Sequence, residues 1–415
     1  MKIYNIKWLI CLALAGSLAG CKKTDGYNTI VSGDKTKPGV VTNIKVANFN
    51  GGAYITYTLP DTKNTLYVKA RYRINDKDFR ETKSSYYSDS VMVSGFAKSD
   101  VYQVTLWTVS RADVQSDSIV VAVHPDTPPF RKVLPTVTLS ADFSGVHITA
   151  LNPLRAAVGV ITVTPDAHGK LQIVNQNYTT QDTIQYSLRG YETTSRQFGI
   201  YITDKWGNIS DTVFSNIKPL YESQMDKGKF APFVLGTDVA TGFGWVIQNL
   251  WDGNNGSPGY HTAQPIQPLV WPAVITFDMG QTAKLSRYTI WDRAIDGSGN
   301  WLWQAGAPLT WVLWGRANTP VDETMPDADH IPAVGGVTPN GWVNLGYFRL
   351  PDKPSKLPNP QYTGEDLAFW NAGFSYDFDI SLPKVRYIRF ECLQNVSLTN
   401  NFFNIAELTF FGDAR

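Results

Sequence analysis

The chain has 415 residues, enough for two to four domains at roughly 100 to 200 residues each. Its formal net charge of +1 excludes a global field that would recruit nucleic acid or an anionic surface. Charged residues make up 18% of the chain, below the usual value of about 25%, whereas aromatic residues make up 13%. This balance favours surfaces that meet neutral partners.

The N-terminus resembles a bacterial lipoprotein signal peptide. The segment MKIYNIKWLICLALAGSLAGC has two lysines, an apolar run shorter than the ~20 residues of a membrane span, and the motif LAGC ending at Cys21. The resemblance implies that residues 1–20 are removed and that Cys21 carries a lipid anchor. Cys11 leaves with the signal, and we expect the remaining Cys392 to be a buried strand residue without a catalytic role.

After a polar tether at 21–35, short alternating apolar runs between Gly, Asn, Asp and Pro predict β-strands almost throughout, with few and short helices. The stretch VTNIKVANFNGGAYITYTLP is echoed by PTVTLSADFSGVHITALNP about 95 residues later, close to the length of one immunoglobulin-like or fibronectin type III-like sandwich. We therefore predict tandem sandwiches at 36–126 and 129–221, joined by the proline-rich HPDTPPF. Neither copy groups carboxylates or histidines, which favours a role as spacers.

Residues 230–415 hold ten of the thirteen tryptophans, and their alternating runs predict a larger all-β sandwich. Five motifs in order, NLWDGNNG, PAVITFDMGQTAKLSRYTIWDR, TWVLWGRAN, KVRYIRFECL and FNIAELTFFG, resemble the discoidin or coagulation-factor type C domain. The resemblance implies a galactose-binding-like jelly roll. A lipid anchor, two sandwiches and a terminal discoidin-like domain together resemble the surface lipoproteins of polysaccharide utilisation loci in Bacteroidota.

The stretch DGSGNWLWQAG follows a predicted strand and combines rings with polar groups. A pyranose packs its apolar C–H face on an indole and needs polar partners for its hydroxyls, so this mixture favours sugar binding. In discoidin-like domains, ligands meet loops at one end of the sandwich, and the arginine that ends this strand often contributes. Arg293 matches that arginine, and a structural ion pair with Asp292 or a loop carboxylate is the alternative role. The candidate ligand-binding residues are Asp292, Arg293, Asp296, Asn300, Trp301 and Trp303 around this loop, with His261, Asn395 and Phe402 from neighbouring loops.

The same resemblance implies a structural calcium ion near the DG turn. The matching positions are Asp252, Thr262 and Glu407, whose oxygen atoms suit a hard cation. The turn here reads DGNNGSPGYHT, with Asn in place of acidic residues, which lowers its charge.

The sequence thus predicts a non-catalytic lipoprotein, anchored in the outer membrane by lipid alone and facing the cell exterior. It would capture carbohydrate for a neighbouring outer-membrane glycan importer and would not bind nucleic acid. A structural or protein-docking subunit is the alternative, since Trp and Arg also anchor protein interfaces. A glycoside hydrolase would need two carboxylates about 5 to 9.5 Å apart, and no local motif requires such a pair.

Overall fold

The computed structural model describes residues 32–60, 63–266, 271–399 and 401–415, so Cys21 and the predicted signal peptide lie outside the described residues. Strands dominate, which confirms the all-β prediction. The described α-helices are short: α2 (Pro129–Val133) and α3 (Gly364–Asn371). Within these ranges, no helix has the length and apolar character that crossing a membrane would require.

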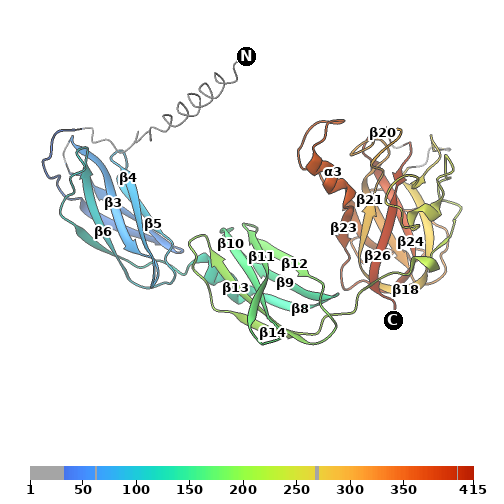
Figure 1. Ribbon diagram of the computed structural model, residues 1–415, viewed down its shortest axis with the longest axis horizontal. Helices are drawn as coiled ribbons and strands as arrows, with labels where there is room; N and C mark the ends of the chain where they lie inside the picture. The colour runs from blue at the N-terminus through green and yellow to red at the C-terminus, as the bar shows by residue number, and fades with distance from the viewer. Residues whose placement is uncertain (1–31, 61–62, 267–270, 400) are drawn as a thin grey trace, which may run out of the picture. The chain divides into compact units, whose positions relative to one another are not determined.

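The first sandwich has two antiparallel sheets (Figure 1). One has the order β1-β2-β5 and the other the order β4-β3-β6-β7. Their strands are β1 (Thr42–Phe49), β2 (Gly52–Thr58), β3 (Thr65–Arg73), β4 (Phe79–Ser85), β5 (Ser90–Ser94), β6 (Tyr102–Ser110) and β7 (Ile119–Val123). Along β3, Val68, Ala70 and Tyr72 are buried while the residues between them face outward, the alternation that pleating imposes.

The middle of the chain forms two further sheets, with orders β12-β9-β8 and β11-β10-β13-β14. Their strands are β8 (Thr138–Asp142), β9 (Gly145–Leu151), β10 (Val158–Pro165), β11 (Leu171–Thr179), β12 (Thr183–Leu188), β13 (Arg196–Asp204) and β14 (Val213–Ile217). The chain divides into two compact units, and residues 216–415 lie entirely in the second.

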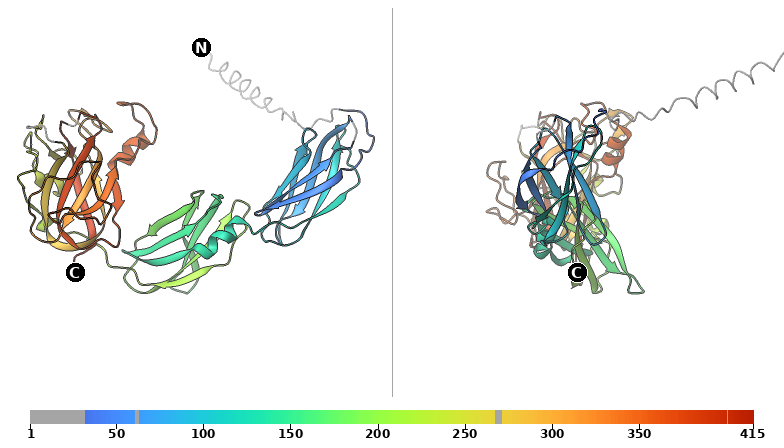
Figure 2. Two further views of the ribbon diagram at one scale, coloured as in Figure 1. Left: turned by 180° about the vertical axis from the view of Figure 1, so that it is seen from behind. Right: turned by 90° about the vertical axis from the view of Figure 1, so that its left-hand side faces the viewer.

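The C-terminal domain is organised around one long strand, the 19-residue β18 (Ala273–Trp291). Its first part pairs with β24 and β16, and its last part pairs with β26 and β23, so β18 belongs to both layers of the sandwich (Figures 1 and 2). The sheet order is β15-β26-β18-β24-β21-β22. The other strands are β15 (Ser223–Gln224), β16 (Ala231–Pro232), β17 (Tyr260–His261), β19 (Ile295–Asp296), β20 (Gly299–Asn300), β21 (Pro308–Arg316), β22 (Val343–Arg349), β23 (Phe374–Asp377), β24 (Val385–Asn395), β25 (Asn404–Ile405) and β26 (Glu407–Asp413).

Aromatic residues fill the core of this domain. Trp311 of β21 is buried, stacks on Phe390 and donates from its Nε1 to the Tyr288 hydroxyl at 2.8 Å. Cys392 is also fully buried, as the sequence predicts. Trp311 is therefore committed to packing and is unavailable to a ligand.

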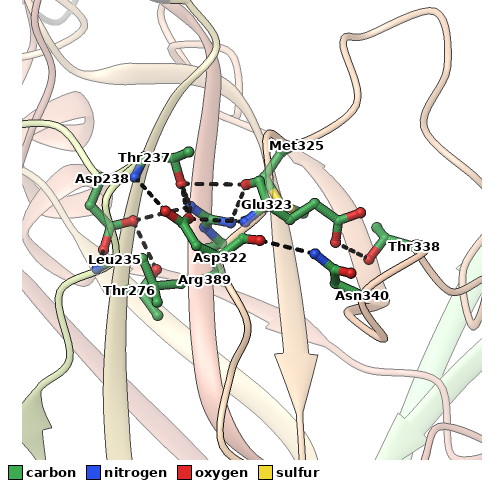
Figure 3. Close-up of polar contacts among 10 residues, drawn as sticks. All are labelled: Leu235, Thr237, Asp238, Thr276, Asp322, Glu323, Met325, Thr338, Asn340 and Arg389. Carbon is green, nitrogen blue, oxygen red and sulfur yellow. Dashed lines mark hydrogen bonds and ion pairs between the residues drawn. The ribbon is translucent and has the colours of Figure 1, made fainter.

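On the outer side of β24, the buried Arg389 holds the connection between β21 and β22 against the sheet (Figure 3). Its guanidinium donates to the Glu323 carbonyl at 2.7 Å and to the Thr237 hydroxyl, and lies 3.4 Å from Asp238 and 3.7 Å from Asp322. The arginine side chain is fully buried, so these partners replace the water that the guanidinium loses.

Arg389→Met is expected to lower the free energy of unfolding by about 3 kcal/mol, because it leaves the buried Asp238 without its cation. The control Arg349→Met removes an arginine whose partner Asp352 is exposed and should cost less than about 1 kcal/mol. Urea unfolding measures both, and equal losses in the two variants would contradict this role of Arg389.

Candidate functional site

The site lies where β18 ends. The Trp291 carbonyl accepts from the Ala406 amide at 2.9 Å, the last ladder contact before the chain turns out into the β19–β20 hairpin. Figure 1 shows β20 at the end of the sandwich opposite the C-terminus. Residues that follow β18 therefore project into the loops of that end.

Arg293 is held by its own hairpin. Its Nε lies 2.7 Å from Asp296 Oδ2, and one terminal nitrogen donates to the Ser298 hydroxyl at 2.6 Å. Its guanidinium carbon lies 4.3 Å from the ring centre of Trp301 and 5.0 Å from that of Trp245. The arginine is thus fixed against two indoles, and one carboxylate balances its charge.

Three more rings pack beside Trp245, directly or through His261. The His261 ring lies edge-on to Trp245 at 5.8 Å and to Phe243 at 4.9 Å, and stacks parallel to Phe402 at 5.1 Å. We call Phe243, Trp245, His261, Trp301 and Phe402, together with Arg293, the aromatic row. It draws on four separate segments of the chain.

Close backbone approach makes the row possible. Gly242 donates its amide to the His261 carbonyl at 2.9 Å, and a Cβ at Gly242 would come within 2.8 Å of the Thr262 carbonyl oxygen. Phe243, the next residue, has φ of 60° and is 69% exposed. A bulky residue with positive φ and an exposed ring is strained and gains no burial, a combination found at functional sites.

The structure brings five of the predicted ligand-binding residues into this row or against it: Arg293, Asp296, Trp301, His261 and Phe402. His261 is itself only 6% exposed, so it packs between the neighbouring rings and offers a ligand little surface. Trp301 is partly buried and donates from Nε1 to Asp296 at 3.2 Å. Hydrogen bonds from Arg293 and Ser298 hold the pKa of Asp296 well below its usual value, although its partial burial acts in the opposite direction. Burial lowers the pKa of His261, so this ring is neutral at pH 7.

Trp303, a predicted ligand-binding residue, is buried and does not lie in the aromatic row. It is 6% exposed, its Nε1 donates to the Pro351 carbonyl at 2.7 Å, and its ring packs on Trp370 at 4.6 Å. In an extended strand, residues 301 and 303 would point to the same side, but the backbone turns here and Trp303 has a φ of 51°.

Three predicted polar residues have structural partners instead of facing the row. Asn300 donates to the Pro360 carbonyl at 2.9 Å and accepts from the Leu302 amide. Asn395 is fully buried and donates to the Phe402 carbonyl at 2.9 Å, so it shapes the loop that carries that ring. Asp292 is buried beneath the hairpin, where it accepts from the Arg293 amide at 2.6 Å.

The residues matched to a calcium site do not fit Ca²⁺ as they are placed. The buried Glu407 accepts from the Lys227 ammonium and, at 3.3 Å, from the Gly253 amide. Asp252 caps its own turn by accepting from the Asn254 amide at 2.8 Å, and the Thr262 hydroxyl accepts from the Phe403 amide at 3.1 Å. Lys227 thus supplies the positive charge beside Glu407. The described ranges hold no group of three His, Cys, Asp or Glu residues that could bind a metal.

Millimolar calcium and excess EDTA are therefore expected to give the same melting temperature within about 1 °C. Differential scanning calorimetry measures this. A rise of several degrees in calcium that disappears in Glu407→Gln would contradict the assignment and restore a metal to this site.

Asp292→Asn is expected to raise the free energy of unfolding more at about pH 8 than at about pH 5. Burial raises the pKa of Asp292 to about 8, and its Oδ2 lacks a hydrogen-bond partner among the described residues. The unfolded carboxyl titrates near pH 3.9, so wild-type stability falls as the pH rises from about 4 to about 8. Asparagine keeps the acceptor for the Arg293 amide and does not titrate. Urea unfolding at both pH values tests this, and a pH-independent effect would refute it.

Comparisons with known proteins match the chain in three parts. Family models described as domains of unknown function match residues 38–125 (DUF4959), 126–228 (DUF5126) and 251–412 (DUF5000). A solved SusE-like protein is 27% identical over 69% of this chain and 100% of its own, with a TM-score of 0.42. A two-domain fibronectin type III segment of chicken tenascin is 12% identical over 43% of this chain and 99% of its own, with a TM-score of 0.21. No curated protein matches the chain.

Sequence reasoning did not select Phe243 and Trp245. The signal was present in the stretch TGFGW, where two glycines surround one aromatic residue and precede another. This glycine-rich stretch lacks the features of a phosphate-binding loop. It does suit a tight backbone turn that exposes aromatic rings. Only the pairing of this segment with 261–263 reveals that Trp245 meets Arg293 and that Phe243 meets His261.

Proposed function

We propose that this chain is a surface glycan-binding lipoprotein and that the aromatic row of its C-terminal domain binds a neutral carbohydrate. The observation that carries the proposal is the row of rings at the loop end of the sandwich, set around an arginine that is balanced by Asp296. Aromatic rings recognise the C–H faces of sugars, and Arg293 and Asp296 offer a donor and an acceptor for hydroxyl groups.

The charge of the site supports a neutral ligand. The ion pair of Arg293 and Asp296 carries no net charge, and His261 is neutral at pH 7. An acidic sugar would therefore meet no excess positive charge here, whereas a neutral pyranose loses little in desolvation when it covers the rings.

Hydrolysis has no support in this cluster. Arg293 and Ser298 hold Asp296 ionised, and Asp292 lies buried under the hairpin, where its carboxyl cannot reach a ligand on the rings. Two opposed carboxylates, which a glycoside hydrolase needs, are not assembled among the row and its hairpin.

The predicted lipid on Cys21 would keep the chain at the outer membrane, facing the cell exterior. Bound polysaccharide would then stay near a neighbouring glycan importer, which raises its local concentration without breaking bonds. Docking onto a protein of that importer would use the same kind of exposed ring and arginine, so the experiment must distinguish the two roles.

Trp245→Ala combined with Trp301→Ala is expected to weaken glycan binding at least about tenfold, since each lost ring contact is worth about 1 kcal/mol. Isothermal calorimetry against a panel of neutral polysaccharides measures the loss. Tyr347→Ala, which removes a ring that is 53% exposed on β22, is the matched control and should bind like wild type.

Two outcomes would oppose this proposal. If the wild-type chain, with its melting temperature intact, binds no neutral glycan, the carbohydrate role fails. If the double variant keeps its glycan affinity but loses co-purification with an importer component, the row is a protein-docking surface.

Trp303→Ala should lower the melting temperature, because its ring is buried against Trp370.

A further inference from the structure

We propose that the first sandwich carries a second binding site, an exposed cationic face that takes an acidic polysaccharide. The cationic face is the outer side of the sheet β4-β3-β6-β7 and consists of Lys69, Arg71, Arg73, Phe79, Lys83 and Trp107. It lies in a different domain from the aromatic row and differs from it in charge, so the proposal goes beyond the neutral site described above.

The strand geometry places the cations in a line. Lys69, Arg71 and Arg73 alternate with the buried Val68, Ala70 and Tyr72 along β3, so the three cations share the outward side. Neighbours on that side are about 6.6 Å apart, at about 3.3 Å per residue. Figure 1 shows β4, β3 and β6 in the first sandwich.

The cross-strand register leaves this charge poorly balanced. Lys69 lies directly opposite Lys83 of β4, an arrangement of like charges that destabilises a sheet. Glu81, opposite Arg71, is the one carboxylate among the outward residues of β3 and β4, and its closest oxygen is 3.8 Å from the guanidinium. Four cations and one carboxylate leave a charge of +3 on the outward side of these two strands.

Acidic residues at the margin form no ion pair with these cations in the described part of the chain. Asp76 and Asp78 lie in the turn between β3 and β4, beyond Arg73, which binds the backbone carbonyls of Asn75 and Asp76. Lys69 and Lys83 make no ion pair that the described part of the chain shows. Each ammonium lies over a ring, Lys69 over Trp107 and Lys83 over Tyr67 at 4.8 Å, so neither charge is neutralised by a carboxylate and both can meet an anionic partner.

Aromatic rings lie between the cations. The Lys69 ammonium lies 4.9 Å from the ring centre of Trp107, and the guanidinium carbons of Arg71 and Arg73 lie 5.4 and 5.2 Å from that of Phe79. Phe79 is 57% exposed. A groove of about 480 Å³, lined by Arg71, Phe79 and Trp107 among others, runs over this face.

This combination fits an acidic polysaccharide. Its carboxylate or sulfate groups would pair with the line of Lys and Arg, and the C–H faces of its sugars would cover the rings. Nucleic acid or anionic lipid would use the charges too, and these ligands are separate outcomes of the test.

The test uses the purified chain from residue 22 onward, titrated by calorimetry with heparin, polygalacturonate and, as a neutral polymer, pullulan. Heparin carries sulfate and polygalacturonate only carboxylate, so the two identify the anionic group. We expect at least one of the two acidic polymers to bind, and its affinity at about 500 mM NaCl should be at least about tenfold lower than at about 50 mM NaCl.

Lys69→Gln combined with Lys83→Gln should weaken that binding about tenfold, and Trp107→Ala should weaken it as well.

The matched control is Lys45→Gln with Lys63→Gln, which removes two exposed charges away from the cationic face and should bind like wild type. The Trp245→Ala, Trp301→Ala variant should also keep its acidic-polymer binding, which separates this proposal from that for the aromatic row. The proposal is overturned if neither acidic polymer binds, or if Lys69→Gln with Lys83→Gln binds as well as wild type. It is equally overturned if single-stranded DNA or phosphatidylglycerol vesicles bind more tightly than both polymers.

Discussion

The C-terminal domain depends on the sharing of β18 between two layers. Its first part is hydrogen-bonded to β24 and its last part to β26, so one strand ties both layers and carries core residues such as Phe277 and Tyr288. The pairing with β26 continues to Trp291, the last residue before the turn. Because β18 is fixed along its length, the position of Arg293, two residues after its end, is also fixed. Backbone pairing brings the segments 242–245 and 402–404 to the same end of the sandwich.

The aromatic row and the Arg389 cluster show two uses of arginine. Arg389 is fully buried among acidic and hydroxyl groups and fastens a long connection to the sheet, so its role is structural. Arg293 lies at the loop end, keeps an ion pair with Asp296 and orders two indoles. Arg389 is too buried to contact a ligand, whereas Arg293 orders rings on a surface that a ligand could cover. Lys227 forms a comparable structural ion pair with the buried Glu407.

Much of the fold was predictable because pleated strands leave a period of two in the sequence, and the buried residues of β3 follow it. The helix α3 was missed although Thr363 and Asp366 form a capping box that its sequence contains. In the candidate site, Trp301 was selected from its place in a polar loop after a strand, and Arg293 from the resemblance to discoidin-like domains. The burial of Trp303 was not predictable, because the alternation that pairs it with Trp301 holds only in a strand and the backbone there turns at positive φ. The contacts of Trp245 depend on a backbone pairing that no local pattern reveals.

The central claim is that a carbohydrate lies on the aromatic row. Hydroxyl-radical footprinting with mass spectrometry, with and without a neutral glycan that binds the chain, tests it most directly, because it reports ring accessibility residue by residue. The account predicts that bound glycan protects Phe243, Trp245 and Trp301 from oxidation and leaves the exposed Tyr347 unchanged. Saturated binding with no protection of these three rings would contradict it.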